Sequence, residues 1–284
     1  MATREIRDEY GRDTGEKMDS VDILRCPVCY ADSFRNLRVI DHRGISKCLS
    51  CGHLFASKYS PDVLAEVYRG EYYASPDDPR IAEWIESNRA VWKGLVDSLG
   101  REAGISSLCD VGSGTGGFLL EYHTCYPTVK LFAVESSDAA RVALKSKIPE
   151  VEFVADSAED LKSASIKVDA VTLLQTLEHV REPKAVCSAI FDILNDGGHL
   201  LVTVPNVRSY KVFLNCDRYC FPNKTHLHFF NGKNVARLLK SVGFSSVRRV
   251  VEFGGGGMNG AGELSQYAAR VLGVSSELRF IAVK

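Results

Sequence analysis

The stretch Leu108-Cys-Asp-Val-Gly-Ser-Gly-Thr-Gly-Gly-Phe118 decides the fold of this 284-residue chain. Its apolar start has the composition of a buried strand. Its glycines let the backbone turn sharply and approach a ligand without a Cβ in the way. The residues after the turn begin a helix, whose first backbone N–H groups face whatever lies at the loop. Such a unit is typical of a nucleotide-binding site in a doubly wound sheet.

Downstream of Ser106, short apolar runs alternate with helical stretches, which predicts an α/β fold with helices on both faces of a mostly parallel sheet. We expect strands at Ser107–Val111, Lys130–Glu135, Val151–Val154, Val168–Leu174, His199–Val204, Ser246–Phe253 and Leu278–Val283. The second strand ends at Glu135, about twenty residues after the glycine loop. A carboxylate at this position can accept hydrogen bonds from both ribose hydroxyls of a nucleotide.

The glycine loop alone leaves two kinds of cofactor open. Gly112, Gly114 and Gly117 satisfy the G-x-G-x-x-G pattern of a dinucleotide dehydrogenase. However, Asp110 precedes the loop, where a pyrophosphate favours a neutral residue and a cationic methyl donor tolerates an acid. A second acidic strand end, Asp156, is placed to reach an adenine amino group. These features favour S-adenosylmethionine (SAM) over a nicotinamide dinucleotide.

Two C-x2-C pairs, Cys26/Cys29 and Cys48/Cys51, lie near the N-terminus with about eighteen residues between them. Two such pairs facing each other form the tetrahedral sulfur cage that zinc prefers, and four thiolates leave no open position for a substrate. We therefore expect a structural zinc ribbon, with a strand over 34–40 and a turn near Arg43. Buried cysteines without metal and a redox pair are the alternatives, and His53 is a substitute ligand.

Composition restricts the class of protein. Hydrophobic residues make up 45% and charged residues 25%, with a net charge of -1, so a strong nucleic-acid or anionic-membrane binder is disfavoured. The charged N-terminus is not a secretory signal, and no apolar run is long enough to span a bilayer. We expect a cytoplasmic protein with a disordered tail (1–20), a zinc-ribbon module (21–57), a helical bridge or lid (58–104) and a SAM-binding domain (105–284).

The bridge is expected to contain helices over Pro61–Tyr68 and Ile81–Val96. Between them Tyr72 and Tyr73 either pack or close over a bound cofactor.

Together these motifs resemble the class I SAM-dependent methyltransferases, in the small-molecule branch with an N-terminal zinc ribbon. The resemblance covers nearly the whole chain after Leu24. It rests on the two cysteine pairs, Glu71-Tyr-Tyr73, Asp110–Gly116, Leu177-Glu-His-Val180, Asp196–Asn206 and His226-Leu-His-Phe-Phe230. It implies a seven-stranded sheet whose last strand runs antiparallel. It also implies cofactor contacts from Asp110, Gly112, Ser113, Gly114, Gly116, Glu135, Ser136, Asp156, Ser157 and Gln175. The segment Gly254–Gly260 departs from the family's tight hairpin and has no assigned role.

Methyl transfer from a sulfonium mainly needs positioning and exclusion of water, but a hydroxyl acceptor also needs a base. The candidates are His179, after the fourth strand, and His226 and His228, on a loop after the fifth. For each, a hydrogen-bonded structural histidine is the alternative. Glu178 is expected to cap or brace its helix. The remaining cysteines, among them Cys216 and Cys220, are expected to be core or surface thiols.

The substrate class is partly indicated by absent motifs. The fourth strand lacks the Pro-Pro-aromatic turn of nucleic-acid amino-methyltransferases, and no paired catalytic cysteine follows it. We expect O-methylation of a small hydroxylated metabolite, a sugar or a natural product, with C-methylation of a sugar second. A SAM-binding regulatory or scaffold subunit that docks or dimerises through the zinc ribbon stays open, and an NAD-dependent dehydrogenase is the least favoured reading.

Overall fold

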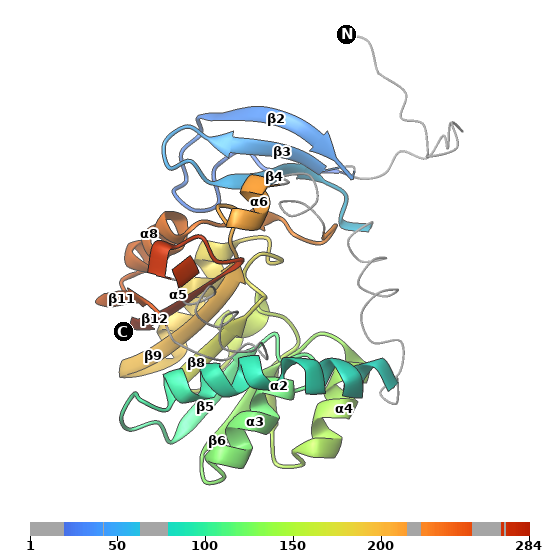
Figure 1. Cartoon of the computed structure of the whole chain (residues 1–284), viewed down its shortest axis with the longest axis vertical. Helices are drawn as coiled ribbons and strands as arrows, with labels where there is room; N and C mark the ends of the chain where they lie inside the picture. The colour runs from blue at the N-terminus through green and yellow to red at the C-terminus, as the bar shows by residue number, and fades with distance from the viewer. Residues whose placement is uncertain (1–19, 42, 63–78, 215–222, 252–267, 270) are drawn as a thin grey trace.

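The computed structural model describes residues 20–41, 43–62, 79–214, 223–251, 268–269 and 271–284. Within this part of the chain, two β-sheets and a set of helices form one connected body (Figure 1). No helix in the described ranges is long and apolar enough to cross a membrane.

The larger sheet has seven strands in the order β11-β12-β9-β8-β5-β6-β7. All neighbouring pairs from β9 to β7 are parallel, whereas β12 runs antiparallel to both β9 and β11. This confirms the predicted fold class and the antiparallel last strand. The strands are β5 (Ser107–Val111), β6 (Lys130–Val134), β7 (Glu152–Ala155), β8 (Val168–Leu174), β9 (Leu194–Pro205), β11 (Ser246–Arg249) and β12 (Glu277–Val283).

Helices cover both faces of this sheet, as the alternating pattern requires (Figure 1). One face carries α2 (Pro79–Leu99), α3 (Gly117–Cys125) and α4 (Asp138–Lys147), which share a buried apolar cluster around Trp92, Phe118 and Leu144. The other carries α5 (Pro183–Ile193), α8 (Gly232–Val242) and the short 3-10 turn η1 (Asp160–Ser163). Burying both faces explains why the central strands are almost continuously apolar.

The smaller sheet belongs mainly to the N-terminal module. Its strands follow the order β1-β4-β3-β2, and β10 pairs antiparallel with Leu54 and Phe55 at the start of β4. They are β1 (Val21–Asp22), β2 (Phe34–Ile40), β3 (Arg43–Cys48), β4 (Leu54–Tyr59) and β10 (His228–Phe229). Because β10 comes from the chain after β9 and the short helix α6 (Tyr210–Leu214), the module is joined to the larger domain by backbone hydrogen bonds.

The module also shares a hydrophobic core with the larger domain. Cys26, Val28 and Cys48 are fully buried in the same cluster as Ile190 of α5 and Leu238 of α8. Asn234 of α8 donates its Nδ2 hydrogen to the Cys51 carbonyl at 3.0 Å. The module therefore packs as an integral part of the fold and is not an independent domain joined by a flexible linker.

Most element positions agree with the sequence prediction. The strands Ser107–Val111 and Val168–Leu174 have the predicted bounds, and the predicted helix Ile81–Val96 lies within α2. The strand over 34–40 is present, and its turn lies just before Arg43. Several predictions fall outside the described residues: most of the 1–20 tail and of the Pro61–Tyr68 helix, Glu71 to Tyr73, the Cys216/Cys220 pair, and the Gly254–Gly260 segment.

Candidate functional site

The glycine loop between β5 and α3 adopts a conformation that only glycine takes without strain. Gly112 and Gly116 have φ values of 78° and 81°. A Cβ built on Gly112 would lie 2.3 Å from Oγ1 of Thr176, and one on Gly116 would lie 2.2 Å from Cδ1 of Leu144. These positions therefore exclude side chains, and the loop packs closely against the turn after β8.

Glu135, at the end of β6, is held against the glycine loop. Its Oε2 accepts a hydrogen bond from the Gly114 N–H at 2.8 Å, and its Oε1 accepts one from the Ser137 N–H at 2.8 Å. The neighbouring Ser113 hydroxyl is buried and has no hydrogen-bond partner among the described residues. A backbone cradle of glycines, a buried hydroxyl without a partner among the described residues and a fixed carboxylate fit the methionine and ribose portions of SAM.

Asp110 lies at the end of β5, next to the loop, and is only 2% exposed. Its Oδ1 accepts a hydrogen bond from the Thr172 hydroxyl at 2.6 Å. Burial is the main cause that raises the pKa of Asp110 to about 7, and the nearby Glu135 charge adds to it while the Thr172 bond opposes it. A cationic ligand beside this carboxyl would favour its ionised form.

The other predicted cofactor residues lie along the same edge of the sheet. They differ in exposure and in the hydrogen bonds that they make within the protein. Ser136 is exposed after β6, and Asp156 is exposed and paired with Arg141. The Ser157 hydroxyl donates to Asp160 at 2.5 Å. Gln175 has a left-handed backbone (φ 51°), and its side-chain amide donates to Thr203 and to Glu277.

A second group of side chains assembles just beyond β8. Glu178 is 1% exposed, and neither of its carboxylate oxygens has a hydrogen-bond partner among the described residues. The Nε2 atoms of His179 and His226 lie 3.9 Å and 4.0 Å from Glu178 Oε1. The two imidazole rings meet edge to face, with centroids 4.6 Å apart. Two of the three predicted catalytic histidines are thus brought together around a carboxyl group, which we name the Glu178 cluster (Glu178, His179, His226).

Burial determines the protonation states of the three side chains of the Glu178 cluster. It raises the pKa of Glu178 to about 8 and is the main cause that lowers the pKa of His179 to about 4 and that of His226 to about 3. Both imidazoles are therefore neutral near pH 7. The expectation that Glu178 braces a helix is wrong, because Glu178 lies in a turn and its carboxylate has no such partner.

The hydrogen bonds around His179 fix which ring nitrogen carries the proton. The Thr225 hydroxyl donates to Asn223 Oδ1 at 2.6 Å, so it accepts from His179 Nδ1, 3.0 Å away. Asn223 Oδ1 also accepts the Thr225 N–H, which fixes the orientation of the amide. His179 is therefore protonated at Nδ1, and its Nε2 directs a lone pair toward the Glu178 cluster.

Arg43, from strand β3 of the N-terminal module, holds the loop that carries His226. Its side chain is 3% exposed, and its Nη1 donates to the carbonyls of Asn223 at 2.9 Å and of His226 at 2.6 Å. The Glu178 carbonyl in turn accepts the N–H groups of Leu227 and His228. The cluster is thus assembled from the module, the turn after β8 and the loop 223–228.

His228 lies away from this cluster, although it is only two residues from His226. It is buried, its Nε2 bonds to the Val180 carbonyl at 2.9 Å, and its Nδ1 bonds to His53 Nε2 at 3.3 Å. Both nitrogens are thus engaged by the protein. His53 is packed against His228 and Phe230, not beside the cysteine sulfurs. His228, a predicted candidate base, is therefore a hydrogen-bonded residue between the module and the larger domain.

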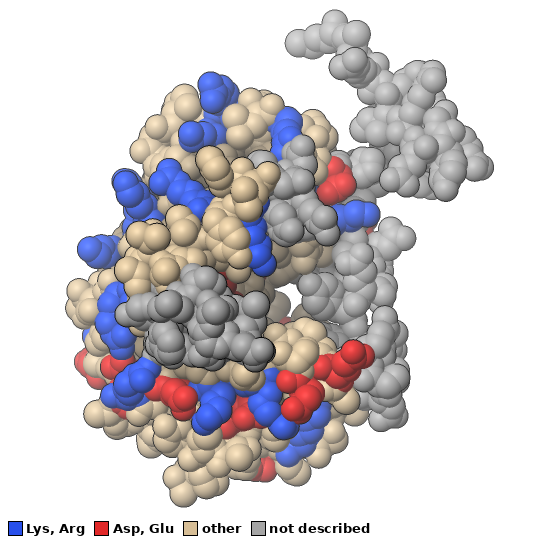
Figure 2. All heavy atoms as spheres, in the orientation of Figure 1, with Lys and Arg blue, Asp and Glu red and all other residues tan. Residues whose placement is uncertain are grey.

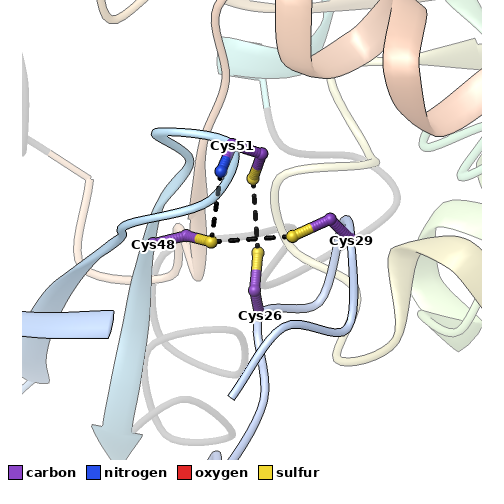
Figure 3. A group of neighbouring side chains, drawn as sticks. All are labelled: Cys26, Cys29, Cys48 and Cys51. Atoms are coloured by element: carbon purple, nitrogen blue, oxygen red, sulfur yellow. Dashed lines mark hydrogen bonds between the residues drawn. The ribbon is translucent and has the colours of Figure 1, made fainter. Parts of the chain in front are cut away.

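The four cysteines of the module form a compact cage (Figure 3). Cys26 and Cys51 have their sulfurs 3.6 Å apart, and so do Cys29 and Cys48. All four sulfurs lie within 4.8 Å of one another. Tetrahedral Zn–S bonds of about 2.3 Å place sulfurs about 3.8 Å apart, whereas a disulfide needs about 2 Å. The donor set and its spacing fit a closed zinc site.

Arg43, Asn223 and Thr225 were not found by sequence reasoning. Arg43 lies where the sequence predicted only a turn, and Asn223 and Thr225 are ordinary loop residues. Arg43 contacts a loop about 180 residues further along the chain, and Thr225 contacts His179, which lies 46 residues before it. The Leu-Glu-His sequence did mark Glu178 as a neighbour of a candidate base.

A doubly wound sheet with a glycine cradle, a fixed carboxylate beside it and a buried polar cluster after β8 is the arrangement expected of a nucleotide-cofactor enzyme such as a SAM-dependent methyltransferase. Comparison with known families agrees: residues 79–250 match the model of a methyltransferase domain family, and the chain belongs to this family. It is a SAM-dependent methyltransferase, and the prediction of a class I enzyme is confirmed.

Individual relatives are distant. A protein of Mycolicibacterium smegmatis named "Probable S-adenosylmethionine-dependent methyltransferase" is 22% identical over 183 residues, which cover 63% of this chain and 67% of that protein. The plantazolicin methyltransferase BamL, solved with S-adenosylhomocysteine, has a TM-score of 0.55 at 14% identity, covering 78% of this chain and 98% of its own. A possible histamine N-methyltransferase from Thermotoga maritima has a TM-score of 0.53 at 15% identity, covering 78% and 99%. These likenesses establish the fold.

Proposed function

We propose that the protein transfers the SAM methyl group to a hydroxyl oxygen of a small metabolite, a sugar or a natural product. SAM supplies an activated methyl group on a sulfonium. The chain binds it through the glycine loop, Asp110 and Glu135, with Ser136, Asp156, Ser157 and Gln175 along the same edge. The acceptor hydroxyl loses its proton at the Glu178 cluster, where His179 and His226 meet.

One observation carries the proposal: the turn after β8 that packs against the glycine loop through Thr176 also carries Glu178 and His179. Thr176, which contacts Gly112, precedes Glu178 by two residues. A neutral imidazole with a lone pair directed into the cluster is what an acceptor hydroxyl needs. Known methyltransferases of similar fold include enzymes named for O-methylation and for a natural product, which is consistent with a small acceptor.

We also propose that the cysteine cage holds a structural zinc ion. Its four thiolates complete a tetrahedral shell, so the ion has no position for a substrate. Its role would be to fold the module, and with it the Arg43 side chain and the strand β4 that pairs with β10. The module therefore supports the acceptor side of the enzyme, in addition to any contact with a partner or a second copy of the chain.

The charge distribution makes a nucleic-acid control necessary. Lys and Arg side chains spread over the part of the molecule with β2, α8 and β11, whereas most visible Asp and Glu side chains lie near α2 (Figure 2). The described residues of 197–214 and 223–250 contain no Asp or Glu. Their basic residues are Arg208, Lys211, Lys224, Lys233, Arg237, Lys240, Arg248 and Arg249. Because the net charge is -1, we assign this surface no nucleic-acid function.

The test is a screen with SAM labelled in its methyl group. Hydroxylated sugars, natural-product aglycones and tRNA are offered as acceptors, and each product is located by mass spectrometry and NMR. A methoxy group on a small hydroxylated acceptor is the expected result. A product methylated on a carbon atom would replace O-methylation with C-methylation in the proposal. Activity on tRNA alone would overturn the small-molecule assignment. SAM binding without turnover on any acceptor, but with stoichiometric binding of a protein partner, would support a regulatory subunit.

A further inference from the structure

We infer that Glu178, His179 and His226 form a second metal site, which binds one divalent transition-metal ion such as Mn²⁺ or Zn²⁺ beside the SAM pocket. The inference deepens the proposed function, because it rests on the acceptor binding at this cluster. It changes how His179 and His226 act: they hold a cation that activates the acceptor hydroxyl, and they do not take the proton directly.

The distances of the cluster suit a cation better than direct hydrogen bonds. The two imidazole Nε2 atoms lie 3.9 Å and 4.0 Å from Glu178 Oε1, beyond the range of a hydrogen bond. One ligand atom from each of the three residues falls within a group 4.8 Å across. A tetrahedral ion with ligands at about 2.1 Å separates them by about 3.4 Å, so the two Glu178–histidine distances need to close by only about half an ångström.

The chemistry of the ligand atoms agrees with this geometry. The Thr225 contact places the His179 proton on Nδ1, so Nε2 is unprotonated, which is the form that binds a metal. The same contact is the outer-shell hydrogen bond that metal-binding histidines usually make through their other nitrogen. Glu178 is buried with both oxygens unpartnered among the described residues, a costly arrangement that an ion would relieve.

Two imidazoles and one carboxylate favour transition metals over Mg²⁺ and Ca²⁺, which prefer oxygen ligands. Three protein ligands also leave a position open for another group. A cavity of about 70 Å³ lies beside His226 and is lined by His228, Ser209 and Phe229 among others. The proposed site thus differs from the closed cysteine cage, and the two sites share no residue.

The proposed role requires no redox chemistry. A cation at this position lowers the pKa of a hydroxyl that reaches it, as metal ions do for water. The O–H bond breaks and its proton leaves to solvent. A C–O bond then forms while the C–S bond of SAM breaks, and S-adenosylhomocysteine departs with the electron pair of that bond. The arrangement orients the acceptor as well as ionising it.

The experiment measures metal binding without SAM or acceptor. Protein with its loosely bound metals removed, and its zinc content verified, is titrated with Mn²⁺, and the free ion is followed by electron paramagnetic resonance. Mn²⁺ is chosen because it binds poorly to thiolate cages. We expect one Mn²⁺ per chain, with affinity reduced at least tenfold in Glu178→Gln and in His226→Gln. His123→Gln, which removes a histidine on α3 outside the cluster, is expected to bind like the wild type.

A measurement on the unmodified protein guards against variants that fail to fold. Bound Mn²⁺ should show magnetic coupling to imidazole ¹⁴N. A wild-type protein that binds no Mn²⁺ up to millimolar concentration, a bound ion without nitrogen coupling, or folded cluster variants that bind as tightly as the wild type would each overturn the inference. Such a failure leaves methyl transfer itself standing, whereas a bound ion without activity on any hydroxylated acceptor would reject only the proposed function.

Discussion

The proposed cofactor side and the proposed acceptor side of the site are built in opposite ways. The cofactor side is local: residues 107–137 supply a strand, the glycine loop, α3 and Glu135, with Gly114 bonded directly to Glu135. The acceptor side is assembled from β3, the turn after β8 and the loop 223–228, which meet only in the folded protein. The cofactor side can be predicted from a local sequence motif, whereas the acceptor side is assembled only by contacts between distant segments.

This difference predicts that the two sides can be damaged separately. Changes in the cysteine module should affect the Glu178 cluster and spare SAM binding, whereas changes in the glycine loop should do the reverse. The four predictions below test this separation, from the largest expected effect to the smallest.

Cys48→Ser should have the largest effect, because it removes one of the four thiolates of the cage, and the free energy of zinc binding contributes directly to the folding of such a module. We expect the zinc content to fall well below one ion per chain and the thermal transition to broaden or shift downward by several degrees. Binding of S-adenosylhomocysteine should change less than threefold. Elemental analysis, thermal melting and calorimetry measure these quantities, with Cys125→Ser, an exposed free thiol, as the matched control. Wild-type protein that contains no zinc would contradict the prediction.

Arg43→Met should lower the free energy of unfolding by about 2–3 kcal/mol, because it removes charge-assisted hydrogen bonds from a buried guanidinium to two backbone carbonyls. Turnover should fall with it, since the loop with His226 loses its support, while affinity for S-adenosylhomocysteine stays within threefold. Urea unfolding and calorimetry provide the readouts. Arg35→Met removes an exposed arginine from β2 and should cost less than about 0.5 kcal/mol. Equal effects of the two substitutions would argue against a positioning role for Arg43.

Gly112→Ala should act on the cofactor side. The added Cβ meets the Thr176 hydroxyl at 2.3 Å in a left-handed backbone, so we expect a loss of about 2–3 kcal/mol in stability and at least tenfold weaker SAM binding. Gly104→Ala is the control, because Gly104 has nearly the same φ, 79°, but nothing within 4 Å of its added Cβ. It should cost about 1 kcal/mol from backbone strain alone and leave SAM binding intact. Calorimetry that finds equal SAM affinities for the two variants would show that the close approach to Thr176 is unimportant.

The smallest effect is a pH dependence from Asp110. With its pKa raised to about 7 in the ligand-free protein, this carboxyl is protonated below pH 7. A cationic ligand favours the carboxylate, so binding lowers this pKa and releases a proton. SAM affinity should therefore rise with pH up to about 7, by at most tenfold per pH unit, and then level off.

Asp110→Asn tests this assignment, since it should bind more weakly at pH 7 and lose the dependence between pH 5 and 7. Calorimetry in buffers of different ionisation enthalpy counts the proton released. An unchanged pH profile in the variant would assign the titration to another group.

Sequence reasoning found the sheet, its seven strands and the cysteine cage because each is encoded by local periodicity or spacing. It also located His179 and His226, since both follow strands at the edge where ligands bind in such sheets. It could not distinguish His226 from His228, because only the fold reveals that His228 bonds to His53 and Val180. Arg43 gave no signal, and Glu178 was misassigned to a helix, because its surroundings come from distant segments.

The central claim, that the glycine loop and Glu135 hold SAM, is tested most directly by calorimetric titration of the purified protein with SAM, S-adenosylhomocysteine and NAD, repeated on Glu135→Ala. We predict micromolar binding of both adenosyl compounds, substantially weaker binding in the variant, and no binding of NAD. Binding of NAD alone, or adenosyl binding that is indifferent to the loss of Glu135, would contradict the account.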